Sequence, residues 1–391
     1  MESCYCWWHA LSISMVQQAL IFMPVKQYPF YIKSTIILFG LILLTYALIN
    51  LRDIFVPIAF AVIFAILLNP LVNRFRKNKI SHVLSITIVM LLAIIVVAGV
   101  FYFLSSQIVG FGDNLPLLKN KFGEILVQLQ NWLHARFGIA ITKQVQLLNE
   151  ALNNSKALLG KTVGTALGTL SVVFLLPVYI FLILLYKSLI LNFLYEVFAE
   201  ENSEQVRAIL NQTKTAIQSY MVGLLLEALI VAVLNSVALL ILRVEYAILI
   251  GVIGALLNMI PYLGGLIAIA LPLLIATVTK DGYSTQLGVI IGYLIIQFLD
   301  NNILVPRIVS SKVKINALVS ILVVLLGNSL WGVPGMFLSI PAIAIVKIIF
   351  DRIDDLKPWG KLLGDEVPTK YGGHMWKRHK KEPSIAEKLV E

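Results

Sequence analysis

The chain has 391 residues, of which 59% are hydrophobic and only 13% are charged, and its mean hydropathy is +0.88. A soluble protein needs about a quarter of its residues charged to cover its surface, so this composition excludes an ordinary soluble domain and indicates an all-α polytopic membrane protein. Cytoplasmic Lys and Arg explain the net charge of +10, because they set membrane topology. The sequence has no basic stripe interleaved with aromatic residues, so no nucleic-acid partner is predicted.

Residues 1–29 are predicted to form a cytoplasmic N-terminus. The start of the chain is unusual, and Met23 is a second candidate for the initiator, which would leave residues 1–22 outside the native protein. The only two cysteines, Cys4 and Cys6, lie in this stretch without further cysteines or a neighbouring histidine cluster. They therefore predict no metal site.

Three transmembrane helices are predicted within residues 30–105, each apolar enough to cross about 30 Å of hydrocarbon. They are Tyr31–Leu51, Ile54–Val72 and Val83–Ser105. The basic cluster at 74–79 falls between the second and the third, and the positive-inside rule assigns it to the cytoplasm. Residues 106–161 are polar and amphipathic, which predicts helices on the extracytoplasmic surface.

Residues 162–215 are predicted to hold a fourth span, Val163–Leu185, and a cytoplasmic helix. Glycines four residues apart lie at the start of this span and favour close packing against another helix. They are Gly160, Gly164 and Gly168. The cytoplasmic helix is predicted to run directly into a fifth span, Ala216–Leu242.

The predicted transport core, residues 216–352, contains two long apolar segments, 246–279 and 316–350. Each would make a helix of about 50 Å, too long for one crossing and too short for two, and each has Gly and Pro helix breakers at its centre. We predict two re-entrant hairpins entering from opposite faces. The residues expected at their tips are Pro261, Gly264, Gly265, Gly327, Gly332, Pro334 and Gly335.

The hairpins decide the predicted topology. With them, Gly288–Val305 is the sixth full span, and the loop after it, which carries Arg307, lies in the cytoplasm. The basic tail, residues 353–391, is then cytoplasmic as well, so that every positive cluster obeys the positive-inside rule. Paired broken segments of opposite orientation are typical of a transport site.

Glu227 is the candidate for proton coupling. It lies in the middle of the fifth span, where a charge costs at least ~2.5 kcal/mol on insertion, and Tyr220 and Asn235 lie on the same helix. The structural alternative is a protonated Glu227 that hydrogen-bonds to another helix for packing alone.

Asp300 is the second candidate. Gln297, Asp300 and Asn301 form one polar face of a helix, with Arg307 beyond it, and Asn258 marks the first hairpin. A carboxylate with neighbouring amides suits a cation or a hydroxyl-rich solute. The alternative is a polar helix end that pairs locally with Arg307.

No enzyme, metal site or cofactor is predicted. Gly110-Phe-Gly-Asp113 matches one motif of intramembrane aspartyl proteases, but the Tyr-Asp pair that such chemistry needs does not occur. None of the five histidines (9, 82, 134, 374 and 379) falls within a predicted span.

Three blocks in the last third resemble the autoinducer-2 exporter family of prokaryotic permeases: Asn258-x-x-Pro261-Tyr-x-Gly264; Gln297-x-x-Asp300-Asn301 with Pro306-Arg307-Ile308; and Gly327-x-x-Leu330-x-Gly332-x-x-Gly335 running on to Pro341. The resemblance covers roughly residues 25–355. Gly265 and Ala317 depart from it, since many members have proline at both positions.

This resemblance implies a secondary transporter in the cytoplasmic (inner) membrane that exports a small polar solute, coupled to protons or a cation. It also implies a homo-oligomer, a pentamer, with an elevator-like movement of the hairpin-containing part. A Na⁺(Li⁺)/H⁺ antiporter is the alternative within transport, and a membrane scaffold without transport is the alternative from another class.

Overall fold

The computed structural model of the protein describes residues 29–113, 115–138, 146, 174–197, 203–260, 264–280, 282–309 and 314–365. All regular structure within these ranges is helical. Six of the helices described are long and apolar enough to cross a membrane, and a bent pair, Phe174–Leu185 with Lys187–Val197, could supply a seventh crossing. The predicted all-helical polytopic fold class is confirmed, whereas the assignment of membrane faces stays a prediction.

The chain divides into two compact units, residues 1–52 and residues 53–391. The first unit contains α2 (Phe30–Asn50), a single helix of 21 residues that matches the predicted span Tyr31–Leu51. Its only charged residue is Lys33, close to its start. Cys4, Cys6 and Met23 lie outside the described residues.

In the second unit, α3 (Arg52–Lys77) and α4 (His82–Asp113) pack with the helix at 174–185 around one apolar core. Ala61 and Ala65 lie in this core, and Asn69 extends their face by one further turn. The Asn69 Oδ1 accepts a hydrogen bond of 3.1 Å from Lys187 Nζ, at the start of α7 (Lys187–Val197). Gly160, Gly164 and Gly168 lie outside the described residues.

Helix α4 extends eight residues beyond Ser105, the end of the predicted span, and α5 (Leu115–Phe137) follows it. A helix does not have to end where its apolar residues end, because its backbone hydrogen bonds are internal and continue equally well in water. Helical structure is thus confirmed for much of the predicted surface segment. Residues 139–145 and 147–161 lie outside the described part of the chain.

Helix α8 (Ser203–Ile241) is the longest helix described, with 39 residues, or about 58 Å at 1.5 Å per residue. It joins the predicted cytoplasmic helix and the predicted fifth span without a break, as expected. A turn at 242–246 then leads into α9 (Ala247–Asn258). The built Cβ of Gly251 would lie 2.7 Å from the backbone nitrogen of Ser236, so α8 and α9 cross with their backbones nearly touching.

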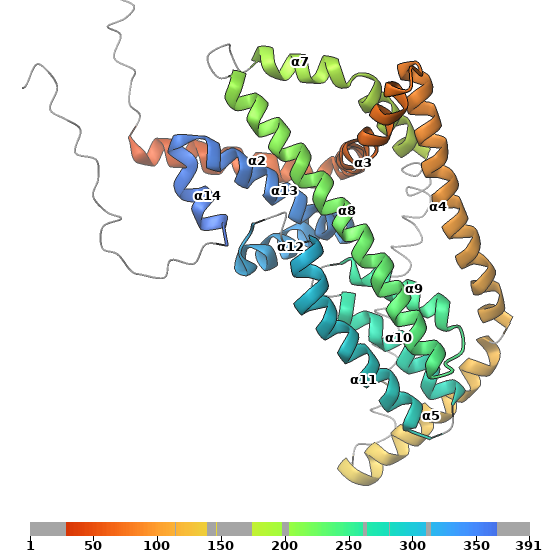
Figure 1. Ribbon diagram of the computed structural model, residues 1–391. Coiled ribbons are helices and arrows are strands. Elements are labelled where there is room, and N and C mark those ends of the chain that lie inside the picture. Colours follow the sequence, from red (N-terminus) through yellow and green to blue (C-terminus); the bar gives the residue numbers. More distant parts are fainter. Residues whose placement is uncertain are drawn as a thin grey trace, which may run out of the picture. The chain divides into compact units, whose positions relative to one another are not determined.

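The two broken apolar segments form two pairs of packed helices (Figure 1). The first pair is α9 with α10 (Gly264–Thr279), and the second is α12 (Ala317–Trp331) with α13 (Val333–Arg352). The breaks fall where the Gly/Pro signals predict them. Helix α13 has 20 residues and is long enough to cross a membrane by itself, whereas α12 has 15, so the two helices of the second pair are unequal in length.

The second pair is held together at two glycines. A Cβ built on Gly335 would collide with the carbonyl oxygen of Gly327, and one built on Gly327 would collide with that of Gly335. Gly332 lies between the helices with φ of +65°, in the left-handed region that favours glycine. These glycines therefore have a packing role, and a ligand role for the tip stays a prediction.

Helix α11 (Ser284–Leu299) does not end as an α-helix. It continues as η2 (Asp300–Val309), a π-helix of ten residues that contains Pro306. Proline has no N–H to donate, and π-helical turns occur frequently at functional sites. The sequence analysis did not predict this change of helix type at Asp300.

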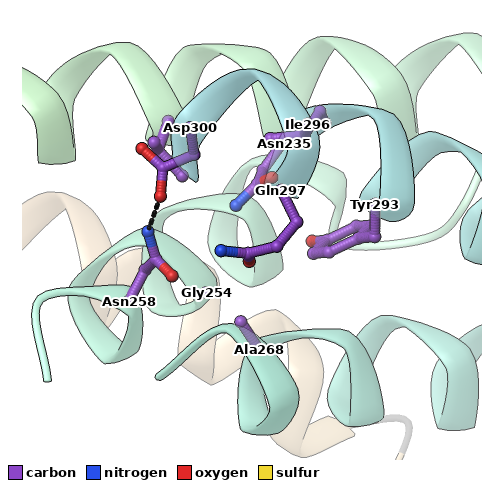
Figure 2. A pocket seen from close by; sticks show the side chains of 9 residues that line it. Asn235, Gly254, Asn258, Ala268, Tyr293, Ile296, Gln297 and Asp300 are labelled. Atoms are coloured by element: carbon purple, nitrogen blue, oxygen red, sulfur yellow. Dashed lines mark hydrogen bonds between the residues drawn. The ribbon is translucent and has the colours of Figure 1, made fainter. Parts of the chain in front are cut away.

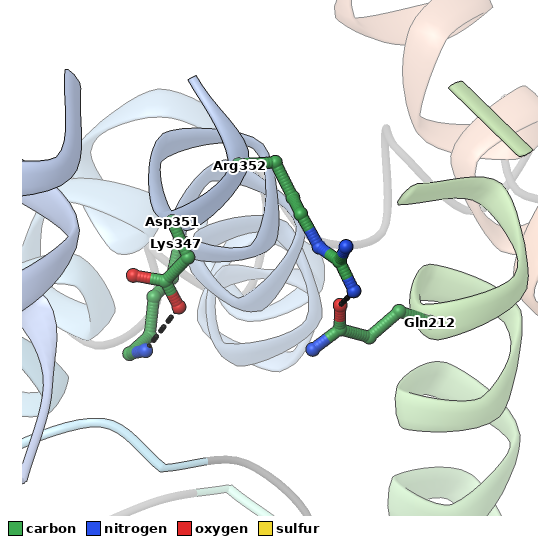
Figure 3. A network of polar contacts seen from close by, with 4 residues as sticks. All are labelled: Gln212, Lys347, Asp351 and Arg352. Carbon is green, nitrogen blue, oxygen red and sulfur yellow. Dashed lines mark hydrogen bonds and ion pairs between the residues drawn. The ribbon is translucent and has the colours of Figure 1, made fainter. Parts of the chain in front are cut away.

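Polar contacts join α13 to its neighbours near its C-terminal end (Figure 3). Lys347 Nζ lies 2.6 Å from Asp351 Oδ2 on the same helix. Arg352 Nη2 donates a 3.3 Å hydrogen bond to Gln212 Oε1 of α8. The first part of the predicted basic tail is itself helical, from Asp354 to Leu363, and residues 366–391 lie outside the described part.

Asn316 fastens α12 to the last described helix, α14 (Lys357–Leu363). Its Oδ1 caps α12 by accepting from Val319 N at 2.8 Å, and its Nδ2 and backbone N donate to Leu362 O and Leu363 O at 2.7 and 3.1 Å. Asn316→Ala removes both side-chain bonds, which are worth about 1–2 kcal/mol.

We expect α14 to detach more often in this variant, so that trypsin cleaves after Lys361 several times faster than in the wild type. Ser329→Ala is the control, because that hydroxyl bonds only within α12, to Leu325 O. Equal cleavage rates in Asn316→Ala and in the control would contradict this role.

Candidate functional site

Two carboxyl groups meet where α8 passes the junction of α11 and η2. Glu227 and Asp300 are 5% and 2% exposed, and their side chains lie within hydrogen-bonding reach of each other. A carboxylate donates no hydrogen bond, so this contact becomes a bond only when one of the two groups carries a proton. Both residues are predicted separately from the sequence, and the fold brings them together.

Asn258 holds the Asp300 carboxyl from the other side. It is the last residue of α9, and its Nδ2 donates a 2.8 Å hydrogen bond to Asp300 Oδ2 (Figure 2). The other oxygen, Asp300 Oδ1, is buried without an N–H or hydroxyl partner in the described part of the chain. The carboxyl is thus oriented by one amide and left with unused acceptor capacity.

Gln297 lies between this carboxyl and the first helix pair. Its Nε2 donates to Asn301 Oδ1 at 3.3 Å, and a Cβ on Gly265 of α10 would overlap its amide group. Glycine at 265 therefore makes room for the Gln297 side chain. This gives a physical reason for the departure from proline noted in the sequence.

A small cavity continues from Asp300 between α8, α9, α10 and α11 (Figure 2). Its lining is Val231, Asn235, Gly254, Asn258, Ala268, Tyr293, Ile296, Gln297 and Asp300. Asn235 comes from α8, whereas Gly254 comes from α9 and Tyr293 from α11. Amide, phenol and carboxyl groups thus share a space with room for about one water molecule.

Tyr293 and Gly254 were missed by the sequence analysis, although a signal existed. Tyr293 precedes Gln297 by four residues and Asp300 by seven, and Gly254 precedes Asn258 by four. Such spacings place residues on one face of a helix. Extending the polar face of each helix by one turn would have found both residues.

The remaining predicted residues lie elsewhere. Tyr220 is buried in an apolar cluster with Ile217, Met221 and Leu338, and does not line the cavity. Arg307 is exposed on η2. Gly264 is buried at the start of α10, where a Cβ would overlap Leu257 O. Pro261 lies outside the described residues, and Pro334 is exposed at the start of α13.

The sequence pattern of one known family, described as AI-2E family transporter, matches residues 36–355. The chain belongs to the AI-2E transporter family. This confirms the resemblance to autoinducer-2 exporters that the sequence blocks indicated. An AI-2E transporter is a multi-pass membrane protein, in agreement with the six candidate crossings.

Relatives of this AI-2E transporter match along most of their length. TqsA of Escherichia coli (strain K12), named an AI-2 transport protein, is 26% identical over 334 residues, which cover 85% of this chain and 96% of TqsA. YueF of Bacillus subtilis (strain 168) is 25% identical over 319 residues, covering 78% of this chain and 86% of YueF. A Haemophilus influenzae protein is 26% identical over 323 residues, covering 80% of this chain and 90% of its own length.

Proposed function

We propose that this AI-2E transporter is a secondary transporter that exports a small polar solute in exchange for protons. The observation that carries the proposal is the contact between the buried carboxyls of Glu227 and Asp300. Ionisable groups within membrane helices are costly and generally functional. Family membership supports transport over the scaffold alternative.

The carboxyl pair suits proton coupling for an electrostatic reason. Two like charges in contact, away from water, repel each other strongly, so the pair is stable with one shared proton. The amides of Asn258, which bonds to Asp300, and of Gln297, which lines the same cavity, carry no charge to neutralise a second carboxylate. Loss of the shared proton would therefore require a change of contacts, and this links protonation to movement.

The solute would bind beside the pair, on the amides of Asn258, Gln297 and Asn301. Neutral amides that donate and accept hydrogen bonds suit an uncharged polar molecule. TqsA carries autoinducer-2 in its name, which makes autoinducer-2 the first solute to test here. By family resemblance the protein is a homo-oligomer, a pentamer, and the part that contains the hairpins moves as an elevator.

The proposed path runs between the two broken helix pairs. In this proposal both pairs are re-entrant and enter from opposite faces, and the chain termini and the loop with Arg307 are cytoplasmic. Irregular backbone at membrane depth is tolerated where it lines a water-filled cavity. The helix ends at Asn258 and Gly264, and the break at Gly332, would then lie along the solute path.

The test uses purified protein in sealed vesicles with a pH-sensitive dye inside. An outward gradient of autoinducer-2 should drive protons inward, and Glu227→Gln should reduce this flux at least about tenfold, because it removes one half of a unit that acts together. Glu245→Gln, an exposed acid in the turn after α8, should behave as wild type.

Parallel vesicles replace the solute gradient by Na⁺, Li⁺ or choline gradients. Proton movement driven by Na⁺ or Li⁺ without any solute would show that the protein is an antiporter and not a solute exporter. Wild-type vesicles that move neither solute nor protons would contradict transport altogether.

A further inference from the structure

Two of the polar atoms that line the cavity are buried and have no hydrogen-bond partner among the described residues. Asn235 Oδ1 and the Tyr293 hydroxyl are both without a hydrogen bond among the described residues, although the two residues are only 2% and 6% exposed. The Asn235 amide makes one long bond, from Nδ2 to Gly251 O at 3.5 Å. An unsatisfied buried polar group is costly, so these two atoms favour a ligand that satisfies both.

Gly254 provides the space for that ligand. A Cβ at this position would lie 3.3 Å from Asn235 Nδ2, 3.6 Å from the Tyr293 hydroxyl and 3.6 Å from Ala268 Cβ. The Asn235 amide, through its Nδ2, and the Tyr293 hydroxyl therefore face the same point, and that point is open because residue 254 has no side chain (Figure 2). The close crossing of α8 and α9 at Gly251 fixes Asn235 in this place.

The chemistry of the two atoms selects a hydroxyl group. Asn235 Oδ1 only accepts, whereas the Tyr293 hydroxyl both donates and accepts. An O–H group can donate to the amide oxygen and accept from the phenol at once. A carbonyl can accept from Asn235 Nδ2 and from Tyr293, but it cannot donate to Asn235 Oδ1 and leaves that atom without a partner, whereas an ammonium cannot accept from Tyr293.

A metal cation fits this cavity less well. Hard cations such as Ca²⁺ and Mg²⁺ take about six or more oxygen ligands. The unpartnered oxygens that line the cavity are Asn235 Oδ1, the Tyr293 hydroxyl and Asp300 Oδ1. The space is also only about the size of one water molecule, which matches a single hydroxyl.

We propose that Asn235, Tyr293 and Gly254 form a subsite that binds one hydroxyl group of the transported solute, with a water molecule there when no solute is bound. The subsite rests on the proposed function, since it extends the solute site from Asn258 and Gln297 towards the turn between α8 and α9. It selects an uncharged solute with a hydroxyl group at one end. Gly254 sets the size limit, because any side chain at 254 enters the subsite.

The test measures binding without transport. Autoinducer-2 or erythritol is titrated onto the full-length protein in detergent, and the apparent Kd follows from the rise in melting temperature, because a ligand stabilises the state that it binds. Tyr293→Phe removes one hydrogen bond and should weaken binding of whichever probe binds by about two- to tenfold. Gly254→Ala fills the space and should weaken it at least as much.

Gly292→Ala is the matched control. It adds the same methyl group to the residue before Tyr293, where the nearest atom, Ala238 Cβ, would lie 3.9 Å away, and it should bind the probe as wild type does. Asn235→Leu should lose affinity as Tyr293→Phe does. A density map of the solute-free protein should contain an ordered water between Asn235 and Tyr293.

The outcomes separate this subsite from the proposed function. If the wild type exchanges solute for protons while Tyr293→Phe and Gly254→Ala bind the probe as tightly as Gly292→Ala, the subsite is wrong and the proposed function stands. If the wild type binds the probe with the expected losses but moves no protons, the subsite stands and the coupling fails. Stabilisation by NaCl over choline chloride that Tyr293→Phe abolishes, without any effect of solute, would overturn the hydroxyl assignment.

Discussion

Asp300→Asn is expected to stop proton-coupled transport as completely as Glu227→Gln, and the double variant should be no worse than either single variant. Each substitution keeps the shape of the side chain but removes one of the two carboxyls that share a proton. When two residues act as one unit, removing both costs no more activity than removing either one. We expect a loss of at least about tenfold in solute-driven proton flux for each of the three proteins.

The structure of the site should survive these substitutions. In the wild type, Asn258 Nδ2 donates to Asp300 Oδ2, and an asparagine at position 300 can still accept this bond. The melting temperature of the Asp300→Asn protein should therefore remain close to that of the wild type. Asp354→Asn, a change at an exposed acid whose ion pair among the described residues is with Lys357 at 2.6 Å, controls for loss of a carboxyl elsewhere. Single variants with independent, multiplying losses would show that the two carboxyls do not act as a pair.

Gly335→Ala is expected to have the largest effect on folding. The added methyl group would collide with the carbonyl oxygen of Gly327, and backbone cannot move aside as a flexible side chain can. Overpacking in a close contact costs about 1–3 kcal/mol, and more where the backbone must shift. Helices in membranes associate largely through close packing, so their crossings need small residues.

The measurement is the melting temperature and the monodisperse yield of purified Gly335→Ala in detergent. Gly99→Ala is the control, since it adds the same atom to α4 at a place with nothing within 4 Å. Gly327→Ala should reproduce the defect from the opposite side of the contact. A Gly335→Ala protein as stable as Gly99→Ala would mean that α12 and α13 do not cross at these glycines.

Much of the fold was predictable because it depends on properties that are local in sequence. Apolar length gives the spans, so that α2, α3, α4 and α11 all begin within a few residues of a predicted span. Helix α8 begins in the segment predicted to lead into the fifth span. Glycine and proline weaken helices wherever they lie, so both breaks were found. The length of α13 was not predicted: the helix has 20 residues, from Val333 to Arg352, and ends two residues beyond the predicted segment.

The site was only half predictable. Glu227, Asp300, Asn235 and Gln297 stand out because a polar residue in an apolar span is costly in any fold. Tyr293 and Gly254 stand out less, because tyrosine and glycine are ordinary in membrane helices, and only their spacing from Gln297 and Asn258 marks them. Their importance arises from what lies opposite them.

The amino-acid sequence by itself determined that this chain is a helical membrane protein, which family it resembles, and which charges are buried, since these follow from composition, length and motif. Only the tertiary structure decided that Glu227 touches Asp300, that Asn258 orients the pair, and that Gly254 leaves Asn235 and Tyr293 facing an open space. Contacts between helices depend on where backbones cross, and the close approach at Gly251 and Ser236 fixes α8 against α9 at a position that no spacing within either helix reveals.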